Sequence, residues 1–402
     1  MIKTIRKLYY SLPRSVQRQF LRTVSFLSFV RRAGVLICND YIQLSIHNVE
    51  QVVGKYKQGI KFHQLVEENT KATRSASHLD GQTVAAIQPL IAKTETVILD
   101  ITQAEFSLRN NHLFDPKLNA IDECGLQFEK MPVHRKLLSK TARKIDGTMA
   151  YLSNVEPSNY YHWMCRTLPL VRVYQQFFDL QEIDFFYVGD SELKDFHKES
   201  LARVGIKPAQ ILQEACTADR ILAAISTRTK QFGSAPVIQA NYDFSRGLFR
   251  QEIETNAAIQ RHRIYVQRGD VKRRKVINES QVIEHLSAYD FIPVRMDNKT
   301  LLEQVQIFSQ AEMIVAPHGA ALTNLLFVQP EVKVIELMPW GYVNNCFYVL
   351  SNYAGADYFY LQSEAIEQKQ ALDEHYLDLY VDIKKLDAIL QKALLESFNN
   401  VA

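Results

Sequence analysis

The chain is poor in cysteine and lacks the short motifs that mark the common catalytic classes. Its 5 cysteines among 402 residues form no C-x-x-C pair, which counts against a disulfide framework or a thiolate zinc site and indicates a reducing compartment. The sequence contains no P-loop, no G-x-G-x-x-G, no G-x-S-x-G and no H-E-x-x-H. These absences exclude the usual signatures of P-loop nucleotidases, dinucleotide enzymes, serine hydrolases and zinc proteases. Asp-x-Asp is also missing, which counts against a metal-dependent sugar-nucleotide site of that type.

Long apolar runs and a strong charge excess are missing as well. No stretch approaches the ~20 apolar residues that span a bilayer, and the first residues lack the apolar region of a secretory signal. With the scattered thiols, this predicts a cytoplasmic location. Lys+Arg minus Asp+Glu is 47 − 44 = +3, which does not indicate a nucleic-acid partner. The length predicts two or three domains.

Acidic residues are absent from the first 39 positions, whereas basic residues are frequent there. The eight basic side chains are Lys3, Arg6, Lys7, Arg14, Arg18, Arg22, Arg31 and Arg32. Apolar residues between them, from Phe20 to Leu27, have helical spacing. Two interpretations stay open. Residues 1–34 could contact an anionic membrane peripherally, which would place the protein at the inner face of the cell membrane, or they form an ordinary surface helix that packs on its own domain.

The remaining chain changes character along its length. Residues 41–95 are polar and mixed, which predicts helix and loop, so that residues 1–95 form a basic helical extension. A β-rich segment follows, and then strands alternate with helices, as is typical of parallel α/β units. The predicted domains are a Rossmann-like domain at 96–245, a second Rossmann-like domain at 246–365 and C-terminal helices at 366–402 that pack back on the N-terminal half.

The clearest pattern lies between residues 263 and 337. Apolar runs predict four strands, at 263–267, 291–296, 313–316 and 332–337. Helices fit between them, with capping boxes at Asn278 and Thr300. This β-α-β-α-β-α-β order predicts a doubly wound sheet. With a weaker unit before it, the fold class is α/β with two facing Rossmann-like domains.

The segment from Ala316 to Asn324 is the first candidate site, because it joins a buried strand to a helix. Ligands of open α/β sheets bind at the carboxyl ends of strands. A helix start offers free N–H groups to a phosphate, and Gly319 would let the backbone come close. The alternative is a plain strand–helix turn in which His318 only caps the helix.

Three further groups could contribute to chemistry. Arg268, Arg273 and Arg274 follow the first strand of the same unit, and their guanidinium groups can hold a diphosphate, unless the loop is merely solvated. His162, in Ser158–Met164, could act as a general base toward an acceptor hydroxyl, although a structural histidine fits equally. Glu336 lies near the end of the last strand and could bind ribose hydroxyls, or form a surface ion pair.

Taken together, three segments resemble glycosyltransferase family 61. They are SNYYHWM, YVQRGDVKRRKVINESQVIEHL and LLEQVQIFSQAEMIVAPHGAALTNLLFVQPEVKVIEL. The resemblance covers about residues 150–340 and implies a GT-B fold with an inverting, metal-independent transfer from a nucleotide-sugar. The residues that match the motifs of the family are Arg268, Arg273 or Arg274, Asn278, Glu279, Gln304, His318, Gly319, Ala320, Asn324 and His162. Gln267 stands where the family often has serine.

The resulting hypothesis needs no cofactor beyond the donor itself. The amides of Gly319, Ala320, Ala321 and Leu322, with Arg268, would hold the diphosphate of a nucleotide-sugar, most simply a UDP-sugar. A saccharide or lipid-linked glycan would accept the sugar in capsular or surface polysaccharide synthesis. His162 is the chosen base, with Glu156 and Asp190 in reserve. A polysaccharide pyruvyl transferase, a sugar-nucleotide epimerase and a non-catalytic scaffold are the alternatives.

Overall fold

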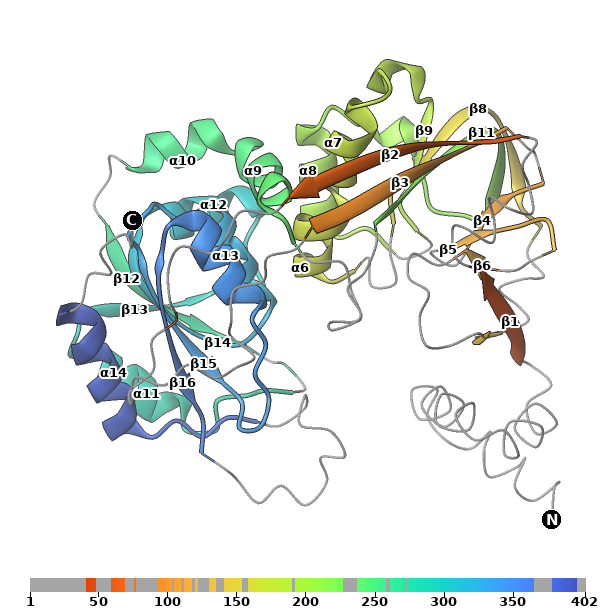
Figure 1. Ribbon diagram of the computed structural model, residues 1–402. Helices are drawn as coiled ribbons and strands as arrows, with labels where there is room; N and C mark the ends of the chain where they lie inside the picture. Colours follow the sequence, from red (N-terminus) through yellow and green to blue (C-terminus); the bar gives the residue numbers. More distant parts are fainter. Residues whose placement is uncertain are drawn as a thin grey trace, which may run out of the picture.

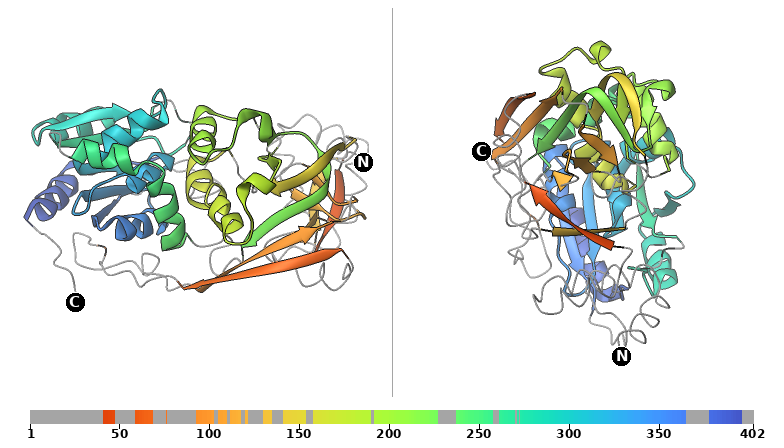
Figure 2. Two further views of the ribbon diagram at one scale, coloured as in Figure 1. Left: turned by 90° about the horizontal axis from the view of Figure 1, so that it is seen from above. Right: turned by 90° about the vertical axis from the view of Figure 1, so that its right-hand side faces the viewer.

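A computed structural model gives the architecture (Figure 1). It describes residues 41–47, 59–68, 76, 93–102, 105–109, 112–117, 120–121, 130–134, 141–153, 158–189, 192–226, 237–257, 261–269, 271, 273–364 and 378–395. The basic segment 1–34 therefore lies outside the described residues. Within the described parts, two β-sheets lie at opposite ends of the molecule, with helices between them (Figures 1 and 2).

The C-terminal sheet has five strands, and every neighbouring pair is parallel. They are β12 (His262–Gln267), β13 (Phe291–Arg295), β14 (Ala311–Pro317), β15 (Lys333–Met338) and β16 (Asp357–Gln362). Their spatial order is β13-β12-β14-β15-β16, the flavodoxin-like order in which ligands bind where the winding reverses, between β12 and β14. The predicted α/β class is confirmed, and the four strands expected from the sequence are all present. The sequence did not predict β16.

Helices cover both faces of this sheet. Alternate residues of each strand point to opposite faces, and the residues on both faces are apolar. On one face lie α12 (Leu301–Ser309), η5 (Ala320–Leu326) and α13 (Cys346–Ala354); on the other lie α11 (Glu279–Ser287) and α14 (Ile383–Leu395). The capping box at Thr300 is confirmed.

Two predictions about the ends of these helices are wrong. Asn278 makes no cap bond; its amide instead exchanges two hydrogen bonds with the backbone of Val381. The described part of the C-terminal segment, α14, packs on β15, β16 and α11 rather than on the N-terminal half. Leu386, Ile389 and Leu390 form its buried stripe.

The N-terminal sheet has eleven strands, and its centre is also parallel. The strands β10 (Ile211–Leu212), β9 (Phe185–Tyr187), β8 (Arg143–Tyr151) and β11 (Cys216–Ser226) lie in that order. A continuous helical segment links β8 to β9: α6 (Tyr160–His162), the π-helical turn η2 (Trp163–Thr167) and α7 (Leu170–Gln175). The helix α8 (Asp195–Arg203) follows β9.

Seven further strands of the described part extend this sheet. They are β1 (Tyr41–His47), β2 (Ile60–Glu68), β3 (Lys93–Ile101), β4 (Ser107–Arg109), β5 (His112–Phe114), β6 (Ala120–Ile121) and β7 (Lys130–His134). Their pairs are antiparallel except for the parallel pair of β1 with β6. The prediction of helix and loop over 41–95 is therefore wrong for β1 and β2. The boundary predicted at residue 95 falls inside β3, because β2 and β3 pair along their whole length and β3 continues onto β11.

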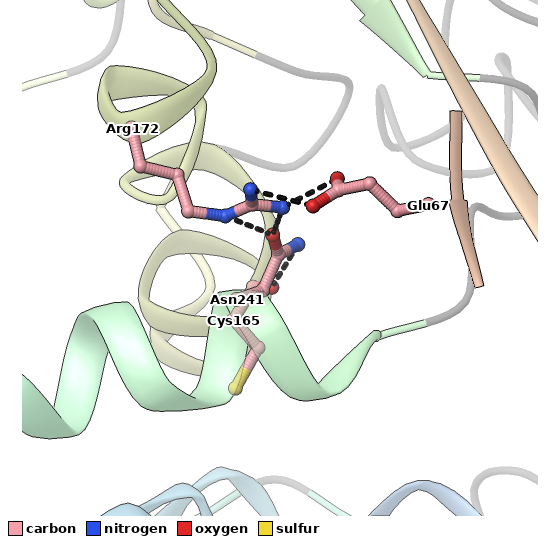
Figure 3. A network of polar contacts seen from close by, with 4 residues as sticks. All are labelled: Glu67, Cys165, Arg172 and Asn241. Carbon is pink, nitrogen blue, oxygen red and sulfur yellow. Dashed lines mark hydrogen bonds and ion pairs between the residues drawn. The ribbon is translucent and has the colours of Figure 1, made fainter. Parts of the chain in front are cut away.

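Two helices that the sequence reading missed, α9 (Gln239–Gly247) and α10 (Arg250–Ala257), lie where the chain passes from one sheet to the other. Asn241 on α9 accepts hydrogen bonds from Arg172 on α7 and donates to the carbonyl oxygen of Cys165, while Arg172 also pairs with Glu67 of β2 (Figure 3). On the other side, Arg246 of α9 donates to the backbone carbonyls of Leu326, which ends η5, and of Val328. α9 is thus fastened to both halves.

Candidate active site

The site lies at the carboxyl edge of the C-terminal sheet, at the point where the strand order reverses. Arg268 follows β12 directly, and His318 follows β14 directly. Because β12 and β14 are parallel neighbours, both residues emerge at the same edge. The Nη1 of Arg268 donates a 2.6 Å hydrogen bond to the carbonyl oxygen of His318.

The Arg268 guanidinium lies where a side chain at position 319 would otherwise be. A Cβ at position 319 would lie 1.8 Å from Nη1 of Arg268 and 3.0 Å from its Cζ. The φ of Gly319 is 173°, an extended value open to any residue, so the glycine is needed for space and not for its backbone angle. The sequence predicted that Gly319 lets another group come close to the backbone. In the structure that group is the side chain of Arg268.

His318 is held by two residues of neighbouring strands. Its Nδ1 is hydrogen-bonded to Oε1 of Glu336, and the hydroxyl of Tyr358 donates to Oε2 at 2.5 Å. His318 is 5% exposed and Glu336 is 0% exposed. Since a carboxylate only accepts, Nδ1 carries a proton, and the second ring nitrogen, Nε2, is the one that Glu336 does not engage. Burial, followed by the nearby charge of Glu336, raises the pKa of Tyr358 well above its usual value, so this hydroxyl remains a donor.

The aromatic rings of Tyr342 and Phe347 flank the His318 imidazole, with centroids 5.2 and 5.1 Å away. The ribose-binding role expected of Glu336 stays a prediction. In this structure both of its oxygens are engaged, and the visible role of the carboxylate is to orient His318.

Positive charge accumulates beside this histidine. Burial lowers the pKa of Arg268 to about 10, with further contributions from Arg274 and Arg273. Burial likewise lowers the pKa of Arg274, whose backbone has the left-handed φ of 58°. In the described part of the chain, neither Arg268 nor Arg274 has a carboxylate ion-pair partner, and the Nε of each is buried without a hydrogen bond. Partly buried cations that repel one another favour an anionic ligand.

The segment after Gly319 is a short helix, as predicted, and it is tightly wound. Ala320 and Ala321 open η5, a 3₁₀-helix of 7 residues. A single short element adds little dipole. The arginine side chains therefore supply most of the positive potential here, and the part played by the amides of Ala320 and Ala321 stays a prediction.

Asn324, expected at the phosphate side, lies in a buried chain of polar contacts between the two halves. The hydroxyl of Tyr160 on α6 donates to Oδ1 of Asn324 at 2.7 Å, and Nδ2 of Asn324 donates to Gln304 at 2.8 Å. Asn324 is 0% exposed. Its phosphate contact stays a prediction, while its visible role is to fasten η5 to α6.

His162, the predicted base, lies on α6 with its helix start capped by Asn159. The Nη1 of Arg166 lies 3.0 Å from Nδ1 of His162. A guanidinium has only donors, so Nδ1 is the acceptor and Nε2 carries the ring proton. As placed, the lone pair that a base needs faces Arg166. The basic role stays a prediction; the alternatives Glu156 and Asp190 lie outside the described residues.

The two histidine regions adjoin through one aromatic ring. Phe347 contacts Tyr161 with a centroid separation of 5.6 Å and contacts His318 at 5.1 Å. The sequence reading missed Phe347, Tyr342, Tyr358 and Arg166. Only Arg166 had a usable signal, since it lies one helical turn after His162. No group of three His, Cys, Asp or Glu side chains that could hold a metal ion occurs among the described residues.

Comparison with known proteins bears on this site directly. Residues 160–335 match the family described as Glycosyltransferase 61, so the resemblance indicated by the motifs is confirmed over somewhat less than half of the chain. A 107-residue stretch is 31% identical to Protein O-linked-mannose beta-1,4-N-acetylglucosaminyltransferase 2 of Takifugu rubripes. That stretch is 25% of this chain and 18% of the relative, so the chain covers about a fifth of the relative's length. Both findings support a glycosyltransferase.

The family match contains His162, Arg268, Arg274, His318 and Asn324, and it ends one residue before Glu336. Arg268, Arg274, His318 and Glu336 converge on one edge of the C-terminal sheet, whereas His162 belongs to the other half. None of the described helices is both long and apolar enough to cross a bilayer.

Proposed function

We propose that the protein is an inverting, metal-independent glycosyltransferase of GT-B architecture that moves a sugar from a nucleotide-sugar to a saccharide or lipid-linked acceptor. The observation that carries this proposal is the pair Arg268 and Arg274, which lie beside the anchored His318 without a carboxylate partner in the described residues. Guanidinium groups match the oxygens of a diphosphate. The C-terminal sheet would hold the donor, and α6 would face the acceptor.

The reaction is a single displacement. The acceptor hydroxyl oxygen attacks the anomeric carbon from the side opposite the leaving group, and the bond from that carbon to the diphosphate oxygen breaks. The electron pair leaves with the nucleoside diphosphate, whose growing charge Arg268 and Arg274 stabilise. When its imidazole is doubly protonated, His318 donates from Nε2 to a phosphate oxygen while Glu336 balances its charge. One hydroxyl proton must go to a base.

His162 is the proposed base, but its Nδ1 is occupied by Arg166. Its Nδ1 must first exchange Arg166 for the acceptor hydroxyl. We expect His162→Gln to lower kcat by about 10²–10⁴-fold while the affinity for the nucleoside diphosphate stays unchanged, as measured by calorimetry and a radiolabelled transfer assay. Near wild-type turnover with the same product would remove His162 from this role.

The cellular setting is part of the proposal. The basic residues 1–34 would hold the enzyme at the anionic inner face of the cell membrane, near lipid-linked acceptors for capsular or surface polysaccharide. Because the relative is named as an N-acetylglucosaminyltransferase, UDP-N-acetylglucosamine is among the first donors to test.

The deciding experiment is a thermal-shift panel of UDP, CMP, GDP, dTDP and ADP, each with and without EDTA. A nucleotide that binds only the folded state stabilises it by about 2.7 kcal/mol at a hundred times its Kd. We expect stabilisation by one diphosphate, unaffected by EDTA and lost in Arg268→Ala. Product analysis then separates the alternatives: a new glycosidic bond supports the proposal, whereas a pyruvyl ketal, an epimer or the absence of any product would refute it.

A further inference from the structure

The sequence contains two tryptophans, and they differ in solvent exposure. Trp163 is 0% exposed and donates from its indole to Ser200 at 2.8 Å. Trp340 is 49% exposed and stands two residues beyond the end of β15. Large aromatic side chains are mostly covered in folded proteins. A tryptophan half exposed at the ligand edge of an α/β sheet is therefore a candidate contact surface.

Two further exposed apolar side chains lie in the same stretch of this edge. Tyr380 is 43% exposed and Ile277 is 56% exposed. The backbone N–H of Trp340 donates to the hydroxyl of Ser363, and the N–H of the next residue, Glu364, donates to the carbonyl oxygen of Tyr380. Trp340 and Tyr380 are thus tied to consecutive residues just after β16.

Ile277 joins the same group through its neighbour. Its N–H donates to the carbonyl oxygen of Leu379 at 2.8 Å, and Val276 forms a bridge with Leu379. We call Ile277, Trp340 and Tyr380 the apolar rim. Its three members come from different parts of the chain, and hydrogen bonds of the backbone set their positions.

The apolar rim lies close in sequence to residues of the candidate active site. Tyr342, two residues after Trp340, packs edge-on against His318, and Arg274 lies three residues before Ile277. β15 and β16 are one and two strands away from β14, at about 4.8 Å per strand. A molecule whose anionic part lies on Arg268 and Arg274 can therefore extend along the carboxyl edge toward Trp340.

We propose that Trp340, with Tyr380 and Ile277 beside it, stacks on the nucleobase of the donor whose diphosphate lies on Arg268 and Arg274. This inference rests on the proposed function. A nucleotide combines a diphosphate with a flat aromatic base, and the edge combines cations with an exposed indole ring in the matching order. Every nucleobase has a π-face, so stacking gives affinity, whereas the choice among bases belongs to other groups.

The two tryptophans supply a direct readout, because a stacked base quenches the exposed indole and leaves the buried one unchanged. The nucleotide that gives the largest thermal shift in the panel is titrated against the full-length protein, and inorganic pyrophosphate is titrated in parallel. The variants are Trp340→Phe and Trp340→Ala. Phe62→Ala is the matched control, since Phe62 is an aromatic residue 57% exposed on β2, in the other sheet.

We expect the nucleotide to quench the wild-type fluorescence and the quench to vanish in Trp340→Phe, which keeps the affinity within about twofold. Trp340→Ala should weaken nucleotide binding about 10-fold while pyrophosphate binding stays unchanged. Phe62→Ala should change neither.

Each contrary result has a separate meaning. Nucleotide binding without a quench, or with equal Kd in wild type and Trp340→Ala, overturns the stacking inference and leaves the proposed function intact. A quench by a saccharide acceptor but not by the nucleotide also overturns it. If no nucleotide binds the wild-type protein, the proposed function fails, and this inference falls with it.

Discussion

Partly buried arginines occur in both halves of the molecule, and their partners differ. In the N-terminal half, Arg172 forms a two-pronged ion pair with Glu67 at 2.9 and 2.7 Å (Figure 3), and Arg220 forms one with Asp100 at 2.8 and 2.9 Å. At the carboxyl edge of the C-terminal sheet, Arg268 and Arg274 have no such carboxylate among the described residues.

The difference separates arginines that hold the fold together from arginines kept ready for a ligand. A guanidinium that meets a carboxylate is compensated, and removing either partner leaves an unpaired charge. A guanidinium crowded by others costs free energy until an anion arrives, which is typical of functional sites. The two sets should therefore respond to substitution in opposite ways.

Among the substitutions that test this difference, Arg268→Met has the largest expected effect. It should lower kcat for sugar transfer by about 10²–10³-fold, because one donor to the leaving diphosphate is lost. The melting temperature of the ligand-free protein should stay the same or rise, since burial and neighbouring arginines oppose this charge. Differential scanning fluorimetry measures the melting temperature, and a transfer assay measures kcat. A clear drop in melting temperature would place Arg268 with the structural arginines.

Gly319→Ala should come next, with a loss of about 10²-fold in activity. The added methyl group would occupy the place of the Arg268 guanidinium and displace it. The matched control is Gly247→Ala at the end of α9, where a Cβ would meet nothing within 4 Å. This control should keep full activity. Equal activity in both variants would show that the position of the Arg268 guanidinium does not matter for catalysis.

Arg172→Met should reveal the opposite behaviour. We expect the free energy of unfolding to fall by about 2 kcal/mol, because Glu67 and Asn241 lose their common partner; the Arg172 side chain is only 13% exposed. Nucleotide affinity should not change. Urea denaturation and calorimetry test this, and a double-mutant cycle with Glu67→Gln isolates the pair. If Arg172→Met instead weakened nucleotide binding and left the stability unchanged, Arg172 would belong with the ligand-binding arginines.

The smallest effect concerns acid stability. Although burial alone would raise it, the pKa of Asp100 is lowered by its hydrogen bonds and charge interaction with Arg220. A carboxyl whose pKa is lowered in the folded state adds stability above its ordinary pKa of 3.8, and that stability is lost as the pH falls below this value. Asp100→Asn should therefore flatten the fall in melting temperature below about pH 4. An unchanged acid profile would argue against this pair.

Local sequence pattern predicted the C-terminal sheet well and the N-terminal sheet poorly. The strands at 263–267 and 313–316 are short apolar runs buried on both faces, so composition alone marks them. β2 is an edge strand with Phe62 exposed, and its pairing with β3 joins residues far apart in the chain. Nothing local distinguishes such a strand from a polar loop.

The site shows the same division. Arg268 and His318 could be predicted because each follows a strand, and parallel strands end at the same edge. The bond from Tyr358 to Glu336 could not be predicted, because it depends on β15 and β16 lying side by side. The bond between Asn278 and Val381 likewise replaced the expected cap, since it joins residues 103 positions apart.

One apolar cluster runs through both halves without interruption, from Leu222 in the N-terminal sheet to Ile264 and Val334 in the C-terminal sheet. A charged contact reinforces this junction, where the carboxylate of Glu199 on α8 accepts the N–H of Leu301 at the start of α12. The two halves therefore share the free energy of a common interior and should unfold in one cooperative transition.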